Sequence, residues 1–289
     1  MSQAPKIAIL GAGRMGCALH AALSRANHPS IIHWTRSAAS ARDALREGFS
    51  VRTGPLPSEL ALADLVLLAV ADSAVNEMAR QLADSGLVRR DATCAHLSGS
   101  LGLETLAPIA ATSRPGSLHL LVSLSSRRDP VEGAFAAIEA VDEMAASTLD
   151  TLARSIGVRT FRLRGDRARY HAAACMVGNY PQVLVESALR LLSDSGLSRD
   201  EARELLAPLL QSAVRNALEK DGAASLSGPI VRGDANIVTA HLSAMGRDPA
   251  LATTAQAYRI LGTIASAMAG HGKDSSVSRA LDEIGRAHV

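Results

Sequence analysis

Aromatic side chains are scarce in this chain of 289 residues, which has one tryptophan, three tyrosines and three phenylalanines. Proteins that bind single-stranded nucleic acids stack the bases on such side chains. The formal net charge is only +2, so the chain also lacks the strongly basic surface that a phosphate backbone attracts. Both shortages argue against a nucleic-acid partner.

Cysteines are few as well. The chain has only Cys17, Cys94 and Cys175, which are far apart in the sequence and odd in number. This pattern is typical of reduced thiols in a cytoplasmic protein and not of a disulfide framework. No two of them have the spacing of zinc ligands, so we expect no metal site. Long hydrophobic runs are also missing, since stretches such as 65–71 are too short to span a bilayer. We therefore expect no leader sequence and no membrane contact.

Hydrophobic residues are abundant, at 47% of the chain, and in the first half they form short runs that alternate with helical segments. Continuous apolar runs of this length are typical of strands that are buried on both faces of a sheet. The alternation predicts the α/β class, with a Rossmann-type, mostly parallel sheet at the N-terminus. The predicted strands are 6–10, 30–34, 64–71, 93–97, 117–124, 134–140 and 158–163, and the helices between them are 17–26, 38–47, 74–85 and 143–156.

The pattern changes at about Arg167, beyond which only helical periodicity remains. The predicted helices are 170–195, 199–220, 237–245 and 251–269, with Pro181 expected to kink the first of them. The sequence thus predicts a Rossmann dinucleotide-binding domain over 1–165. A second, all-α domain for substrate binding and dimerisation is expected over 166–289. We expect the polar stretch 270–289 to fray.

A glycine motif, Gly11-Ala-Gly13-Arg14-Met15-Gly16, follows directly after the first predicted strand and opens the first predicted helix. The motif alone is a weak signal, but its strand and helix context is that of a dinucleotide-binding loop. There the first glycine allows a tight turn, the second lets the backbone approach a pyrophosphate, and the third lets the helix pack on the strand. The helix N-terminus then offers free N–H groups to the phosphates. The alternative is a glycine-rich turn without a ligand.

The end of the second predicted strand indicates which nicotinamide cofactor is bound. An NAD-preferring site has an acidic residue there that holds the ribose 2′-OH. This strand is followed by Thr35, Arg36 and Ser37, and no acid is present. Arg36 can pair with a 2′-phosphate and the two hydroxyls can donate hydrogen bonds to it. We therefore expect NADP(H), although Arg36 could also be a solvated loop cation.

Ligands of parallel α/β sheets bind at the carboxyl ends of the strands. Val70, Ala71 and Asp72 follow one buried strand, and Ser98 and Gly99 follow the next. We expect all five to line the cofactor site. Asp72 could instead simply cap the next helix, and the second pair could be an ordinary turn.

Histidines and an asparagine supply the candidate catalytic groups. His119 lies in a predicted strand, where a lone histidine is more often a satisfied core residue. His171, Cys175 and Asn179 are spaced by four residues and so share one face of a predicted helix. His171 is the first candidate for a proton donor, since an ordinary imidazole titrates near neutral pH. Asn179 would hold a polar atom of the substrate.

A second group lies further along the chain, where Arg232 and Asp234 follow turn-forming residues and His241 comes two helical turns later. Arg232 could pair with a substrate carboxylate through its planar fork of N–H donors. The alternative is a local arrangement in which Asp234 caps a helix and Arg232 forms a surface ion pair.

Taken together, the segments named at the end of this paragraph resemble a bacterial family of Rossmann-like proteins whose C-terminal helical domain has no assigned function. Members of this family are often described as related to deazaflavin-dependent NADP oxidoreductases. More distant resemblance extends to ketopantoate reductase, pyrroline-carboxylate reductase and the β-hydroxyacid dehydrogenases. The chain departs from the family at Ala71 and Leu120, where proline is usual. The segments that carry the resemblance are the glycine motif 11–16, the turn 98–99, the strand 117–119, and 170–180, 228–234 and 241–242.

The resemblance implies an NADPH-dependent reductase of a C=O or C=N bond in a small oxo or imino acid. Several of the distant relatives carry a lysine four residues before an asparagine, and Cys175 stands at that place before Asn179. Pyrroline-carboxylate reductase-like enzymes manage without this lysine. The alternative is a regulatory or scaffold protein that binds NADP(H) without turnover. We expect a homodimer, because the C-terminal helices are apolar around much of their surface.

Overall fold

The computed structural model describes residues 5–28 and 31–283. It divides into two compact units, Met1–Asn179 and Tyr180–Val289. The predicted division after residue 165 marks the change from strands to helices, whereas the first compact unit also includes the helix that follows. Each unit is described by itself below.

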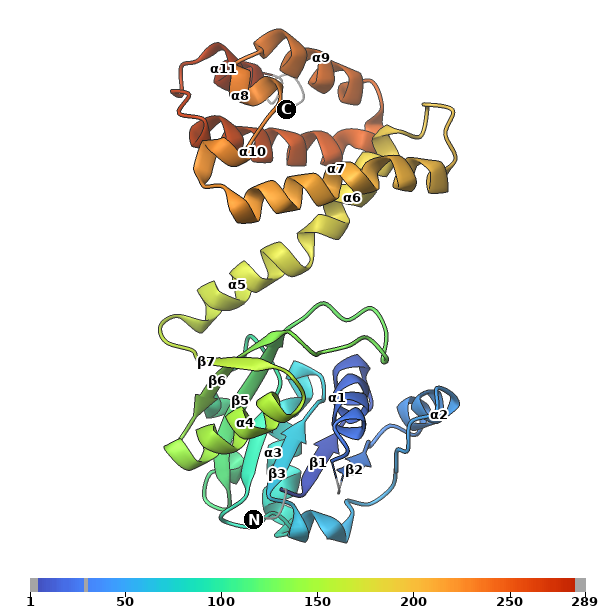
Figure 1. Cartoon of the computed structure of the whole chain (residues 1–289), viewed down its shortest axis with the longest axis vertical. Coiled ribbons are helices and arrows are strands. Elements are labelled where there is room, and N and C mark those ends of the chain that lie inside the picture. Colours follow the sequence, from blue (N-terminus) through green and yellow to red (C-terminus); the bar gives the residue numbers. More distant parts are fainter. Residues whose placement is uncertain (1–4, 29–30, 284–289) are drawn as a thin grey trace. The chain divides into compact units, whose positions relative to one another are not determined.

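The first unit is built on a sheet of seven strands among the described residues, in the order β2-β1-β3-β4-β5-β6-β7 (Figure 1). Strands β1 to β5 are parallel, β6 runs antiparallel to β5, and β7 is parallel to β6. The predicted α/β class and Rossmann-type sheet are therefore confirmed. Ser30, the predicted start of the second strand, lies outside the described residues. The strands are β1 Ile7–Leu10, β2 Ile31–Trp34, β3 Leu65–Leu68, β4 Thr93–His96, β5 Arg114–Leu121, β6 Phe135–Ala140 and β7 Arg159–Arg162.

Strands β1 and β3 are buried along their whole length because helices cover both faces of the sheet. Alternate side chains point to opposite faces of a strand. Ile7 and Ile9 pack with α1 and α4, while Ala8 and Leu10 pack with α3 and η2. The elements that surround the sheet are α1 Arg14–Arg25, α2 Ala38–Arg46, η1 Ser58–Leu62, α3 Asp72–Ser85, η2 Leu103–Ile109, α4 Glu143–Ser155 and α5 Arg167–Gly178.

The single helix predicted over 170–195 is wrong, because the structure has two helices there. Helix α5 ends at Gly178, and α6 begins at Tyr180. Pro181 explains the break, since it has no N–H to donate and its ring clashes with the carbonyl four residues earlier. What the sequence suggested as a kink is therefore a full interruption at Asn179.

The second unit is helical, as predicted, with a core of aliphatic side chains such as Val238 and Leu242. The predicted fraying after residue 270 is wrong for 276–283, which form a helix, while 284–289 lie outside the described residues. Val277 and Leu281 of that helix are buried because they form one apolar stripe. The elements are α6 Tyr180–Leu191, α7 Arg199–Glu219, η3 Gly222–Ser225, α8 Pro229–Arg232, α9 Ala235–Gly246, η4 Pro249–Leu251, α10 Ala252–Met268 and α11 Ser276–Glu283.

No helix in the described part of either unit is long and apolar enough to cross a bilayer.

Candidate functional site

Two glycines of the motif are required by the fold itself. Gly11 has a φ of +127°, and a Cβ there would lie 2.2 Å from the carbonyl oxygen of Ala69. A Cβ on Gly16 would lie 2.1 Å from the carbonyl oxygen of Gly11. Real Cβ atoms do not approach other atoms so closely, so any side chain at either position would force the β1 turn away from α1 or β3. These contacts are the tight turn and the close helix packing that the motif predicts.

Gly13 differs, because a Cβ at this position would meet no atom within 4 Å. It is the N-cap of α1, and no side chain bonds to the first N–H groups of this helix. Arg14 is exposed and Met15 is half-buried at the same end. The N-terminus of α1 thus presents free N–H donors, the positive end of the helix dipole and open space in which a phosphate group can approach the backbone.

A pair of histidines that sequence reasoning missed is hydrogen-bonded to the glycine loop. Nε2 of His33 lies 2.9 Å from the carbonyl oxygen of Gly11, and its Nδ1 lies 2.7 Å from Nδ1 of His20. Because a carbonyl can only accept, Nε2 of His33 carries the proton and His20 donates to Nδ1. Burial lowers the pKa of His33 to about 4 and lowers the pKa of His20 as well. Both rings are therefore neutral near pH 7 and hold the turn without adding charge.

The predicted 2′-phosphate residues lie together after β2. Thr35 is buried, and its N–H donates to the carbonyl oxygen of Arg52 at 2.9 Å. Ser37 caps α2, since its Oγ accepts the N–H of Ser40 at 3.2 Å. Arg36 is exposed, and its guanidinium has no hydrogen bond or ion pair with the rest of the described chain. Its charge is thus available to a ligand.

The ends of β3 and β4 are joined by a small polar network. Asp72 is the first residue of α3 but not its cap, which is Ala71, and Val70 directly precedes this pair. One carboxylate oxygen of Asp72 accepts from Oγ of Ser98 and from Oγ of Ser100, both at 2.7 Å. The simple capping role considered for Asp72 is therefore wrong. Its carboxylate instead fixes the turn after β4.

The predicted catalytic residues His119, His171 and Asn179 line one cleft of about 510 Å³ in the first unit. Nδ1 of His119 lies 2.7 Å from the hydroxyl of Tyr170, and the rings of the two histidines are 5.9 Å apart between centroids. A Cβ on Gly99 would lie 2.6 Å from atoms of both imidazoles. The turn that was predicted to line the cofactor site is therefore in direct contact with the cleft.

Burial determines the protonation states of His119 and Tyr170 in this cleft. Burial lowers the pKa of His119 to about 4, and nearby His171 and Arg167 add to the effect. Burial also raises the pKa of the Tyr170 phenol. The His119–Tyr170 pair is therefore neutral near pH 7. Sequence reasoning missed Tyr170 as a member of the site, although it directly precedes His171. The Cys175 thiol also lines the cleft, with Sγ 3.7 Å from Nε2 of His171.

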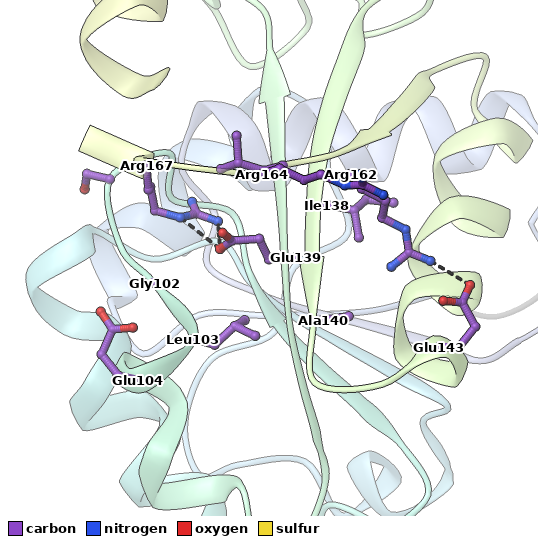
Figure 2. A pocket seen from close by; sticks show the side chains of 12 residues that line it. Gly102, Leu103, Glu104, Ile138, Glu139, Ala140, Glu143, Arg162, Arg164 and Arg167 are labelled. Atoms are coloured by element: carbon purple, nitrogen blue, oxygen red, sulfur yellow. Dashed lines mark hydrogen bonds and ion pairs between the residues drawn. The ribbon is translucent and has the colours of Figure 1, made fainter. Parts of the chain in front are cut away.

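Arg167, at the start of α5, holds this helix against the sheet. Its Nη1 donates to the carbonyl oxygens of Ser98 and Gly99 at 3.2 Å, and its Nη2 donates to Oγ of Ser117 at 3.1 Å. The same guanidinium forms an ion pair with Glu139 of β6, as Figure 2 shows. Only 10% of the Arg167 side chain is exposed. Arg167 therefore positions α5, and with it the cleft residues Tyr170 and His171, over the strand ends.

A larger cleft, of about 730 Å³, lies beside the Arg167–Glu139 pair and contains none of the predicted site residues (Figure 2). Its walls are charged, and Arg162 forms an ion pair with Glu143 at 2.7 Å. Across the described residues, no group of three or more histidines, cysteines or acids could hold a metal ion.

Arg232 and His241 belong to the second unit and have local partners there. Nε of Arg232 lies 2.9 Å from a carboxylate oxygen of Asp234, which is the N-cap of α9 but makes no side-chain cap bond. Nδ1 of His241 lies 2.8 Å from the hydroxyl of Tyr258. The ion pair matches the local alternative considered above. The role of Arg232 as partner of a substrate carboxylate stays a prediction.

Comparison with protein families assigns both halves of the chain. A model of a Rossmann-like domain matches residues 2–122, and the model of a domain of unknown function, DUF2520, matches residues 134–264. A comparison with curated protein sequences gives no match.

Among solved structures, a candidate NADP oxidoreductase of Bacteroides fragilis superposes with a TM-score of 0.74 at 23% identity, covering 91% of this chain and 98% of that one. Plasmodium falciparum pyrroline carboxylate reductase with NADP bound gives 0.60 at 15% identity, covering 92% and 98%. A reductive aminase of Aspergillus terreus in complex with NADPH4, cyclohexanone and allyl amine gives 0.61 at 19%, covering 98% and 100%. These likenesses concern the fold. The chain belongs to the proteins that join a Rossmann-like domain to a C-terminal DUF2520 domain.

Proposed function

We propose that this protein is an NADP(H)-dependent oxidoreductase that reduces a C=O or C=N bond of a small oxo or imino acid. One observation carries the proposal: the glycine turn at residue 99 touches both histidines of a substrate-sized cleft and lies at the strand ends where a Rossmann domain binds its dinucleotide. The names of the similar structures support the same class of reaction, since they include NADP-linked reductases.

The residues present fit a dinucleotide. The open backbone at Gly13 and the uncapped N-terminus of α1 accept the pyrophosphate, beside Arg14 and Met15. The exposed and unpaired Arg36 can donate hydrogen bonds to a 2′-phosphate next to Thr35. The turn after β3, with Val70, Ala71 and Asp72, and the turn at 98–99 would flank the nicotinamide end. When bound, NADPH supplies the hydride for the reduction.

The protein's own residues hold the substrate and supply the proton. His171 donates a proton to the substrate oxygen or nitrogen as the adjacent carbon is reduced, and water then reprotonates the imidazole. The side-chain amide of Asn179 donates a hydrogen bond to the same polar atom. His119, held by Tyr170, stays neutral and forms the wall of the cleft. A neutral wall leaves the charge of the substrate's acid group to be paired elsewhere.

The cofactor assignment is tested by titrating the protein with NADPH and with NADH and following nicotinamide fluorescence. We expect tight binding of NADPH, and the Arg36→Ala variant should weaken it by about tenfold to a hundredfold, because a charged hydrogen bond contributes about 1.5–3 kcal/mol. NADH binding should be unchanged in that variant. Arg42→Ala removes an exposed arginine from the neighbouring helix and serves as the control. Equal losses for both nucleotides would contradict the assignment of Arg36.

A second candidate is a protein that binds NADP(H) without turnover. Cys175 favours it, because this thiol stands where several related enzymes carry a lysine, and no lysine lines the cleft. A panel of oxo and imino acids, each mixed with the NADPH-loaded protein, separates the two candidates through the oxidation of NADPH.

We also propose that the second unit mediates homodimer formation. Leu184 of α6 and Leu209 of α7 border an apolar groove, and both are exposed together with Leu205 and Leu218. Patches of this kind are rare on monomers, and twofold dimers are the commonest assemblies that cover them. Light scattering should give twice the 30.1 kDa of one chain, and Leu209→Asp should shift the mass towards the monomer. A monomer in the unsubstituted protein would contradict this proposal.

A further inference from the structure

The long connection between β5 and β6, residues 122–134, is the green loop in Figure 1, and two hydrogen bonds join it to the glycine loop. Nη1 of Arg14 donates to the carbonyl oxygen of Leu124 at 2.7 Å. Nε of Arg127 donates to the carbonyl oxygen of Ala12 at 3.2 Å. Ala12 is the residue between the first two glycines of the motif. A segment more than a hundred residues away in the sequence is thus part of the surroundings of the phosphate loop.

Hydrogen bonds, an ion pair and a buried side chain hold this connection in place. The carboxylate of Asp129 accepts the N–H groups and hydroxyls of Ser125 and Ser126, which holds the pKa of that carboxyl well below its usual range. Arg25 of α1 forms an ion pair with Glu132 at 2.6 Å. Val131 is fully buried in the core that covers one face of the sheet. The position of Arg127 is therefore fixed from both sides.

The guanidinium of Arg127 has N–H donors that are not used within the described part of the chain. Its guanidinium carries five N–H groups, of which the structure uses one for Ala12 and one for an ion pair with Glu47. Its Nη2 has no partner in the described part of the chain. The side chain is only 21% exposed, so water screens its charge weakly. Arg128, the next residue, donates from its Nη2 to the backbone carbonyl oxygen of Glu47, and its guanidinium lies 5.3 Å from the ring centre of Phe49. It makes no hydrogen bond to the glycine loop within the described residues.

We propose that Arg127 is a cofactor-binding residue that pairs with the pyrophosphate of the bound dinucleotide. The inference rests on the proposed function and adds a phosphate-binding residue from outside the glycine motif. Helix N-termini bind phosphate through N–H groups and a partial charge, whereas a planar guanidinium adds a full charge and a bidentate contact. Glu47 competes with the pyrophosphate for this guanidinium, so binding exchanges one anionic partner for another.

Fluorescence titration with NADPH and with NADH tests this role. Arg127→Met should weaken both nucleotides by a similar factor of at least about tenfold, because both contain the pyrophosphate and a charge-assisted bond is lost. Arg36→Ala, in contrast, should affect NADPH alone. Arg128→Met is the matched control from the same loop and should stay within about twofold of the unsubstituted protein for both nucleotides.

Glu47→Gln separates a binding role from a merely structural one. If Arg127 binds the pyrophosphate, removal of its competing anion should leave NADPH affinity unchanged or raise it. If Arg127 only ties the loop to α2, Glu47→Gln should weaken NADPH as much as Arg127→Met does, and the inference is overturned. The inference is also overturned if the unsubstituted protein binds NADPH and the affinity of Arg127→Met for NADPH is within twofold of it. If the unsubstituted protein binds neither nucleotide, the proposed function itself fails.

Discussion

Replacing Arg167 with methionine is expected to lower the free energy of unfolding of the first unit by about 3 kcal/mol, within the 3–5 kcal/mol typical when one partner of a buried ion pair is removed. The variant leaves Glu139 without its counter-ion, and it leaves two backbone carbonyls and the Ser117 hydroxyl without their donor. Methionine fills a similar volume, so the loss reflects charge and hydrogen bonding more than a cavity.

Urea unfolding followed by tryptophan fluorescence measures this loss in the right unit. The chain has one tryptophan, Trp34, and it is buried at the end of β2. Adding Glu139→Leu to Arg167→Met should restore part of the stability, since it removes the uncompensated charge. Arg154→Met breaks an exposed ion pair with Asp150 and should cost less than about 1 kcal/mol. Equal midpoints for Arg167→Met and Arg154→Met would show that Arg167 does not hold α5.

The network around Arg167 also shows where sequence reasoning stops. Its partners are separated from it by 69, 50 and 28 residues, at Ser98, Ser117 and Glu139. No periodicity or motif links such positions, because they meet only when β4, β5 and β6 are side by side. The support of the glycine loop by His33 is a similar case, since the histidine reaches Gly11 only through the pairing of β1 with β2.

The parts that could be predicted depend on local or repeating physics. Buried parallel strands produce continuous apolar runs, and such runs located β1 and β3. The other five predicted strands also overlap strands of the described sheet, including β6, which is antiparallel to β5, and β7, which is largely exposed. The glycine motif could be interpreted residue by residue because its steric demands involve the turn itself and the adjacent strand. The failure at α11 has a different cause. Its buried residues Val277, Ala280 and Leu281 have helical spacing, but the polar residues between them masked a stripe of only three.

The candidate catalytic group could be predicted in part for the same reason. His171, Cys175 and Asn179 lie on one helical face by spacing alone, and the structure places all three along one cleft. Their connection to His119 and Gly99 depends on the docking of α5, which no local pattern reveals. Tyr170 was overlooked because its role is defined by a partner 51 residues away.

His171→Ala is the variant expected to have the largest effect on turnover. Loss of a positioned proton donor lowers the rate by about a hundredfold to ten-thousandfold, while NADPH affinity should be unchanged because the imidazole lies in the substrate cleft. The measurement is kcat/KM with whichever oxo or imino acid the protein reduces, together with the Kd of NADPH. Met176→Ala is the control, because this side chain is 59% exposed on the same helix and does not line the cleft.

The result for His119→Phe then distinguishes the two histidines. Since burial lowers the pKa of His119 to about 4, its ring is neutral near pH 7 and is a poor proton donor there. Phenylalanine would keep the wall of the cleft but lose the bond to Tyr170, so we expect a smaller fall in kcat/KM than for His171→Ala. If His171→Ala retained full turnover while His119→Phe abolished it, the proton would have to come from the Tyr170–His119 pair, and the roles proposed for the two histidines would be reversed.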